Sequence, residues 1–269
     1  MTQSNKGVSL LPKPEGFCVL ALVRSLLFVL IVVLWGSNHI LAQVRTDRPQ
    51  YSRLNTFSVF GAYSGDSSHM FLGYAQNRKL LNIGVAYSRR LIAGRVVNWQ
   101  YNAELMPVAL ESDPVVHSVV SQQTPTVETY VSDFRQWGAC IPMSEAYSNA
   151  ASDGVVFSGT VTLTCGRIWT VGEAMSPVGF QWNFRPRHKV QPVFIGHGGY
   201  MYSTEQIPVD DAGAFNFTFD IGGGVEIFQS ETRSIRADYR YHHISNDDTA
   251  GYNPGIDSGL FQITYSFGR

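Results

Sequence analysis

Alternating apolar and polar positions dominate the chain beyond Arg45. In residues 214–228 the odd positions are mainly apolar and the even positions mainly polar. The odd set is Phe215, Phe217, Phe219, Ile221, Val225 and Ile227, and the even set includes Asn216, Thr218, Asp220 and Glu226. This period of two predicts a β-strand with one apolar and one polar face.

The same alternation predicts eight strands. Their ranges are 54–63, 80–91, 96–108, 173–184, 190–203, 214–228, 233–244 and 257–267. Short turns at 185–189 and 229–232 then lie at one end, and the longer segments 204–213 and 246–256 lie at the other. Short periplasmic turns and longer external loops are typical of outer-membrane barrels.

Two all-β architectures fit such strands. A soluble two-sheet sandwich would turn its apolar faces inward. The polar faces, however, carry Arg236, Asp238 and Arg240, which can pair with one another inside a narrow lumen. We therefore predict an eight-stranded antiparallel transmembrane β-barrel of the bacterial outer membrane, filled by its own side chains and without a pore.

The N-terminal segment is predicted to be a signal peptide, residues 1–43. Basic residues precede the apolar run 25–35, which is too short to span a bilayer comfortably, and Ala42 or Gln43 marks the cleavage site. An uncleaved membrane anchor is the alternative, and Arg24 within the longer apolar run argues against it. The mature chain, residues 44–269, is then exported to the outer membrane.

Residues 109–172 are irregular apart from one possible extra strand, 154–163, and are predicted to be a long insertion. A large external loop is the preferred interpretation, and a small plug or a periplasmic insert is the alternative. The segment holds Cys140 and Cys165, the two cysteines of the mature chain. An even pair in an exported protein predicts a disulfide.

Composition narrows the function classes. The net charge is −1 and only 15% of residues are charged, so no basic surface for nucleic acid is expected. Two cysteines without histidines at ligand spacing are too few for a metal site. We expect no metal and no cofactor, and the sequence carries no prediction of oligomeric state.

Candidate chemistry lies in the segment HHISNDDTAGYNPGID, residues 242–257. His243 and Ser245 share one face of a strand, about 6.5–7 Å apart at Cα. The following hairpin is expected to bring Asp257 roughly opposite Ser245, on the same outward face. A serine, a histidine and a carboxylate would then meet at the outer membrane rim, where polar groups are costly without a function.

This segment resembles the signature of the lipid A 3-O-deacylase family, the PagL-type outer-membrane esterases. The matching positions are His243, Ser245, Asn246, Asn253, Gly255 and Asp257. The acid is Asp257 where the best-known family members carry Glu, and from sequence alone Glu is expected to be tolerated there. The resemblance covers most of the mature chain apart from 109–172.

The resemblance implies a serine esterase that hydrolyses the 3-O-linked acyl chain of lipid A, a lipopolysaccharide modification in the outer leaflet. Ser245 would be the nucleophile, His243 the general base and Asp257 the group that orients His243. Loop amides near Asn246, Asn253 and Gly255 would stabilise the oxyanion. The alternative is a non-catalytic structural or adhesive outer-membrane barrel that retains this hairpin.

Overall fold

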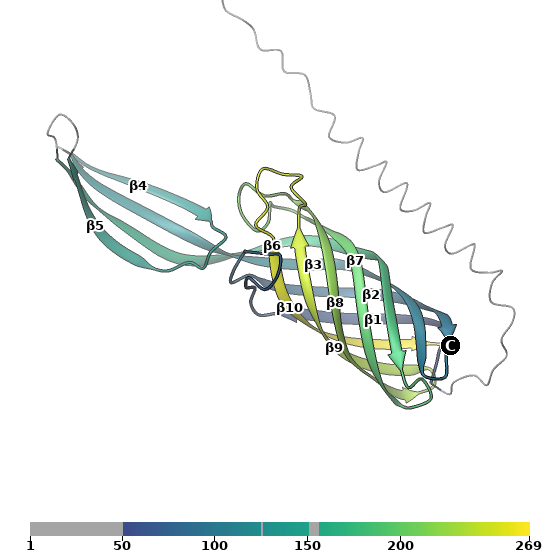
Figure 1. The fold of residues 1–269 in the computed structure, drawn as a ribbon. Helices are drawn as coiled ribbons and strands as arrows, with labels where there is room; N and C mark the ends of the chain where they lie inside the picture. Colours follow the sequence, from purple (N-terminus) through teal and green to yellow (C-terminus); the bar gives the residue numbers. More distant parts are fainter. Residues whose placement is uncertain (1–50, 125, 151–155) are drawn as a thin grey trace, which may run out of the picture. The chain divides into compact units, whose positions relative to one another are not determined.

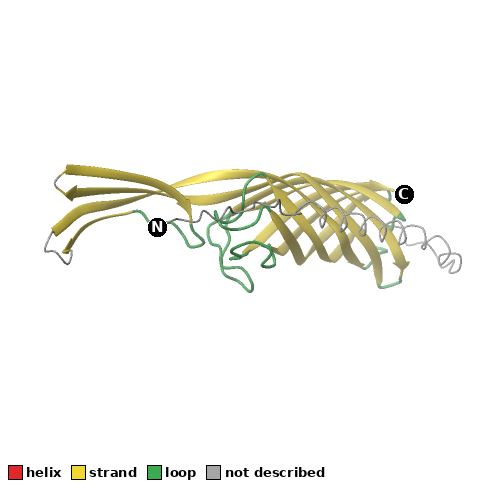
Figure 2. Ribbon diagram, turned by 90° about the horizontal axis from the view of Figure 1, so that it is seen from above, coloured by secondary structure: helices red, strands yellow, loops and turns green. Residues whose placement is uncertain are grey.

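The computed structural model describes residues 51–124, 126–150 and 156–269 (Figure 1). The predicted signal peptide and its cleavage site lie outside the described residues. Every described element is a strand (Figure 2), and no helix in this part of the chain is long and apolar enough to cross a membrane. The strands are β1 (Asn55–Ser64), β2 (Lys79–Ala93), β3 (Val97–Thr124), β4 (Thr126–Arg135), β5 (Met143–Ala150), β6 (Val156–Phe184), β7 (Val190–Ser203), β8 (Phe215–Ser230), β9 (Arg233–Ser245) and β10 (Ile256–Gly268).

Eight of these strands close into an antiparallel barrel. The strand β1 pairs with both β2 and β10, and β3 pairs with β6. The ring order is therefore β1, β2, β3, β6, β7, β8, β9 and β10. The barrel and its eight strands are confirmed, and most predicted strand ends lie within two residues of the observed ones.

The barrel turns its apolar face outward. Phe217, Phe219 and Phe261 are 41%, 45% and 50% exposed, whereas the intervening polar positions of β8, β9 and β10 are buried. A sandwich would bury these phenylalanines, so that alternative is excluded. A closed sheet with an outward apolar belt suits a bilayer, because the ring of paired strands leaves no open edge and the hydrocarbon meets apolar side chains.

Ion pairs fill the lumen, as predicted from the polar faces. Arg240 Nε lies 2.6 Å from Asp238 Oδ1, and Arg240 Nη1 lies 3.1 Å from Glu104 Oε2. Arg236 Nε lies 2.8 Å from Asp238 Oδ2. These side chains are almost fully buried, and pairing offsets the large cost of placing charges there.

The insertion differs from the predicted loop. Beyond their barrel pairing, β3 and β6 continue side by side and are flanked by β4 and β5. The described residues 113–124, 126–150 and 156–171 thus form a four-stranded sheet with its connections, here called the extension (Figure 1). Its positions follow no clean alternation, because many described side chains on both faces are exposed. Cys140 and Cys165 form a disulfide in it, linking the segment before β5 to β6.

The two ends of the barrel differ in their connections. Tight turns join β2 to β3, β6 to β7 and β8 to β9 at the end that carries the C-terminus (Figure 1). The opposite end carries the loops 65–78, 204–214 and 246–255 together with the extension, and Figure 2 shows loops gathered at this junction. The long-loop end is the external one by the usual arrangement of such barrels.

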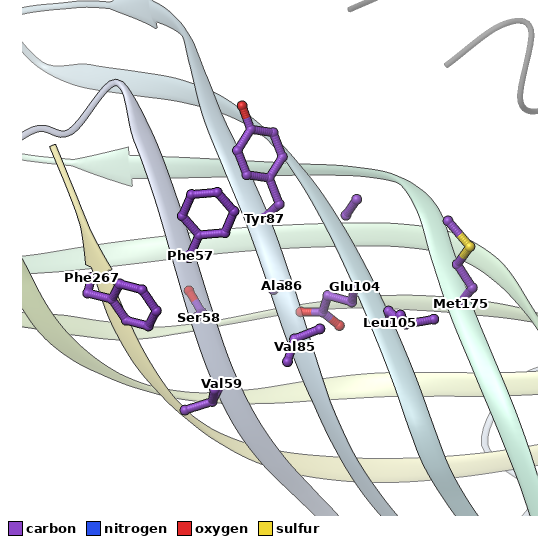
Figure 3. A pocket seen from close by; sticks show the side chains of 11 residues that line it. Phe57, Ser58, Val59, Val85, Ala86, Tyr87, Glu104, Leu105, Met175 and Phe267 are labelled. Carbon is purple, nitrogen blue, oxygen red and sulfur yellow. The ribbon is translucent and has the colours of Figure 1, made fainter. Parts of the chain in front are cut away.

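An apolar hollow of about 520 Å³ lies in the outward wall of the barrel, over β1, β2 and β3 and the adjoining parts of β6 and β10 (Figure 3). Phe57, Val85, Leu105 and Met175 are among its lining residues. Neither His243, Ser245 nor Asp257 lines it. The hollow therefore belongs to the lipid-facing surface and not to the candidate chemistry.

Candidate active site

His243 and Asp257 are cross-strand neighbours at the external ends of β9 and β10. The Nδ1 atom of His243 lies 2.6 Å from Oδ1 of Asp257. The expectation that Asp257 stands opposite Ser245 is wrong: the register places it opposite His243, two residues earlier. Because the two residues are directly paired between neighbouring strands, the carboxylate contacts the imidazole.

The carboxylate of Asp257 is held from several sides. Tyr241 donates its hydroxyl proton to Oδ1 at 2.7 Å, and the backbone amides of Phe71 and Leu72 donate to Oδ2 at 2.7 and 2.8 Å. The Asp257 side chain is fully buried although its position faces outward, because the loop between β1 and β2 covers it. Donors to both oxygens favour the ionised carboxylate and fix its orientation.

The covering loop, residues 65–78, was not recognised from the sequence as part of the site. It is anchored by backbone contacts to β10: Ser67 bridges to Ser258, and Ala75 bridges to Ile256. Gly73 lies against Asp257, and a Cβ at this position would be 2.6 Å from the Asp257 amide nitrogen. No periodic pattern marks these residues, so they could not be found from the sequence. Tyr241, by contrast, shares the parity of His243 and could have been found.

Ser245 is the last residue of β9 and lies beside Phe217 of β8. Its Oγ lies 2.9 Å from Nδ2 and 3.1 Å from Oδ1 of the Asn253 side chain. The same Oγ accepts a hydrogen bond from the backbone amide of Asp247 at 3.1 Å. Ser245 makes no hydrogen bond with His243 in this state. The structure thus brings His243 and Asp257 together and leaves Ser245 bonded to the loop.

The remaining predicted residues shape this loop. Asn246 is buried and donates from Nδ2 to the Tyr252 carbonyl at 2.8 Å. Gly255 has φ +58°, a backbone conformation that glycine adopts without strain. A Cβ at this position would lie 3.1 Å from Cε1 of His243, so glycine also leaves room for the imidazole ring. Asp247 and Asp248 also have positive φ, in a turn that suits Asp.

The site opens sideways on the outer surface of the barrel. His243 keeps 14% of its side chain exposed, and its ring stacks on that of Tyr241 with centroids 6.5 Å apart. With Nδ1 engaged by Asp257, Nε2 is the nitrogen left to act on a substrate or a serine. His242 points the other way, into the lumen, with Nδ1 3.9 Å from Asp220 Oδ2.

The described part of the chain contains no cluster of metal-ligating side chains. Among the residues that the structure describes, no group of three or more His, Cys, Asp or Glu side chains is placed to hold a metal ion. Asp247 and Asp248 are exposed in the loop. The described site thus contains an imidazole oriented by a carboxylate, with Ser245 two residues further along β9 and bonded to the loop.

A protein-family comparison agrees with the resemblance seen in the sequence. The family model for lipid A 3-O-deacylase (PagL) matches residues 135–266. This stretch includes β7, β8 and β9, most of β10 and the candidate residues. The resemblance is confirmed over this part of the chain. No curated protein matches.

Several solved barrels are similar to this chain at low identity. The outer membrane enzyme PagL is 11% identical, with a TM-score of 0.43, and the match covers 79% of this chain and 99% of that one. Neisserial surface protein A is 12% identical, with a TM-score of 0.37 and 80% and 97% coverage. The outer membrane protein OprG from Pseudomonas aeruginosa is 9% identical, with a TM-score of 0.38 and 83% and 100% coverage.

Proposed function

We propose that this chain, whose residues 135–266 match the lipid A 3-O-deacylase family, is an outer-membrane esterase that releases the 3-O-linked acyl chain of lipid A. Ser245 is the nucleophile, His243 the general base and Asp257 the group that orients His243. The observation that carries the proposal is the buried Asp257 carboxylate, 2.6 Å from His243 Nδ1, on the outward face of the external rim.

The reaction divides into acylation and hydrolysis. His243 Nε2 takes the proton of Ser245 Oγ as Oγ bonds to the ester carbonyl carbon. The proton then passes to the departing alkoxide of the sugar as the ester C–O bond breaks. Water next attacks the acyl-serine with His243 as the base, and fatty acid and free Ser245 result. Asp257 holds the ring tautomer and stabilises the imidazolium.

Acylation requires a side-chain rotation of Ser245 from the loop toward His243. Catalytic hydrogen bonds are often not formed before substrate binds. The rotation frees the two donors that hold Ser245 Oγ at rest, Asn253 Nδ2 and the Asp247 amide. These donors converge beside the reacting carbonyl and serve as the oxyanion hole.

The substrate class follows from the position of the site. A site that opens sideways at the external rim meets amphiphiles of the outer leaflet, where the ester of an acylated sugar lies at the depth of His243. Asp257, Tyr241 and His243 are placed by β9, β10 and the loop 65–78, so the barrel wall itself orients the base.

Expression in Gram-negative cells whose lipid A keeps its 3-O-acyl chain tests the function. Mass spectrometry of extracted lipid A should show the loss of one hydroxyacyl chain with the wild type and no loss with His243→Gln, at equal amounts of folded barrel. Unchanged lipid A with both proteins would favour the alternative, a structural or adhesive barrel. The hydrogen bond that Ser245 makes with Asn253, in place of one with His243, is the observation that favours this alternative.

A further inference from the structure

An exposed apolar tip lies beside the Asp257 carboxylate. Within the loop 65–78, the side chains of Met70, Phe71, Leu72 and Tyr74, here called the tip, are 38%, 75%, 60% and 54% exposed. Four of the five residues 70–74 thus carry large, mainly apolar side chains that are exposed and close together in the chain. Water is an unfavourable environment for such a patch, which usually marks a binding surface.

The backbone of the tip is fixed although its side chains are exposed. The amides of Phe71 and Leu72 hold Asp257, and the Tyr74 amide donates to the Pro254 carbonyl at 2.7 Å. The His69 ring stacks on Tyr74 with centroids 4.5 Å apart. Serine or threonine could supply the same amides, so the hydrogen bonds to Asp257 do not account for the apolar side chains.

The tip continues the lipid-facing surface of the barrel. The Phe71 ring packs edge-on against Tyr241 with centroids 5.3 Å apart, and Tyr241 stacks on His243. Tyr241 occupies an outward position of β9, directly above the exposed Tyr239. The patch therefore lies where the external rim meets the outer leaflet, a depth at which amphipathic and aromatic side chains anchor membrane proteins.

We infer that the tip inserts among the acyl chains of the outer leaflet and that this insertion keeps the Phe71 and Leu72 amides on Asp257. The catalytic consequence rests on the proposed function, whereas the insertion does not. Loss of the apolar side chains removes the lipid contact but leaves both amides. The loop then leaves its position more readily, and the orientation of Asp257 and His243 is lost for part of the time.

Fluorescence quenching tests the insertion without any need for activity. With Cys140 and Cys165 held in their disulfide, a fluorophore is attached at Phe71→Cys or, as control, at Val131→Cys in the extension, which is 70% exposed. The protein is placed in phosphatidylcholine vesicles with brominated acyl chains. We expect bromine to quench the label at 71 and iodide to quench the label at 131. Quenching of the label at 71 by iodide would show that the tip lies in water and would overturn the insertion. A label at 71 that neither bromine nor iodide quenches would show that protein, such as a second copy of the chain, covers the tip, and would also overturn it.

Enzyme kinetics test the coupling to Asp257. We expect Phe71→Ser/Leu72→Ser to lower kcat on lipid A in vesicles at least tenfold with a folded barrel. Phe71→Leu/Leu72→Ile keeps the side chains apolar and should have the kcat of wild type. The matched control in the extension, Val127→Ser/Val131→Ser, should also leave kcat unchanged. Equal kcat for the tip variant and wild type would overturn the coupling. Inactive wild type would instead contradict the proposed function and leave the quenching result standing.

Discussion

His243 and Asp257 face each other across β9 and β10, with Nδ1 of the imidazole 2.6 Å from Oδ1 of the carboxylate. Because the two residues are directly paired in the sheet, their separation is fixed by backbone geometry. An aspartate is long enough for this distance. A longer acidic side chain is therefore not needed to reach the His243 ring.

Asp257→Asn should lower kcat by about three orders of magnitude and leave the barrel folded, because the amide no longer selects the correct tautomer of His243. Residual activity should remain above that of a variant without the nucleophile. Single-turnover deacylation of lipid A measures the effect. Retention of full activity would show that Asp257 does not orient His243.

Asp257→Glu should lower kcat about 10- to 100-fold, which revises the sequence-based expectation that Glu is tolerated. The carboxylate is fully buried beneath Gly73, and one added methylene displaces either the carboxylate or the loop. Misplacement by about 1 Å is enough for such a loss. An unchanged kcat would mean that the loop adapts without cost to the site.

Tyr241→Phe should lower kcat about tenfold with little change in KM, because it removes a hydrogen bond of 2.7 Å to the charged Asp257. The matched control is Tyr239→Phe, an exposed tyrosine two residues earlier on the same face. Equal losses in the two variants would contradict a specific role for the Tyr241 hydroxyl.

Gly73→Ala should reduce activity at least tenfold without unfolding the barrel. The new methyl group meets the Asp257 amide nitrogen at 2.6 Å and the Ile256 carbonyl carbon at 2.8 Å, so the loop must move away from β10. Gly61→Ala is the control, because a Cβ at Gly61 has no neighbour within 4 Å. Similar activity of both variants would show that the loop position is unimportant.

Removal of the disulfide with Cys140→Ser/Cys165→Ser should weaken the extension locally by about 3 kcal/mol, since the bond closes a segment with a sequence separation of 25. Limited proteolysis should cut residues 136–142 faster, whereas the heat-dependent gel shift of the barrel should not change. If the gel shift of the barrel moved to a lower temperature in this variant, the expectation that the disulfide stabilises only the extension would be contradicted.

The strands of the barrel were predictable because each has one face in lipid and one in the lumen. The parity of Phe217 against Thr218, repeated in the other strands, predicts both the strand and its orientation. The extension was not predictable in the same way. Val131 and Tyr130 are neighbours on opposite faces of β4, and both are exposed, so no alternation results.

Within the site, His243, Ser245 and Asp257 could be named from the sequence, but their pairing could not. The hairpin register depends on a loop in which Asp247, Asp248 and Gly255 adopt positive φ. Residue count alone does not reveal such turns. The amides of Phe71 and Leu72 carry no side-chain signal at all, because any non-proline residue can donate them.

The most direct test of the esterase proposal is fatty acid release from lipid A by purified protein in detergent, compared between wild type and Ser245→Ala. Ser245 has little packing to lose, so both proteins should show the same heat-dependent gel shift. We predict that wild type removes one ester-linked acyl chain per lipid A and that Ser245→Ala removes none. Equal release by the two proteins, or no release by wild type where a known deacylase is active, would contradict the proposal.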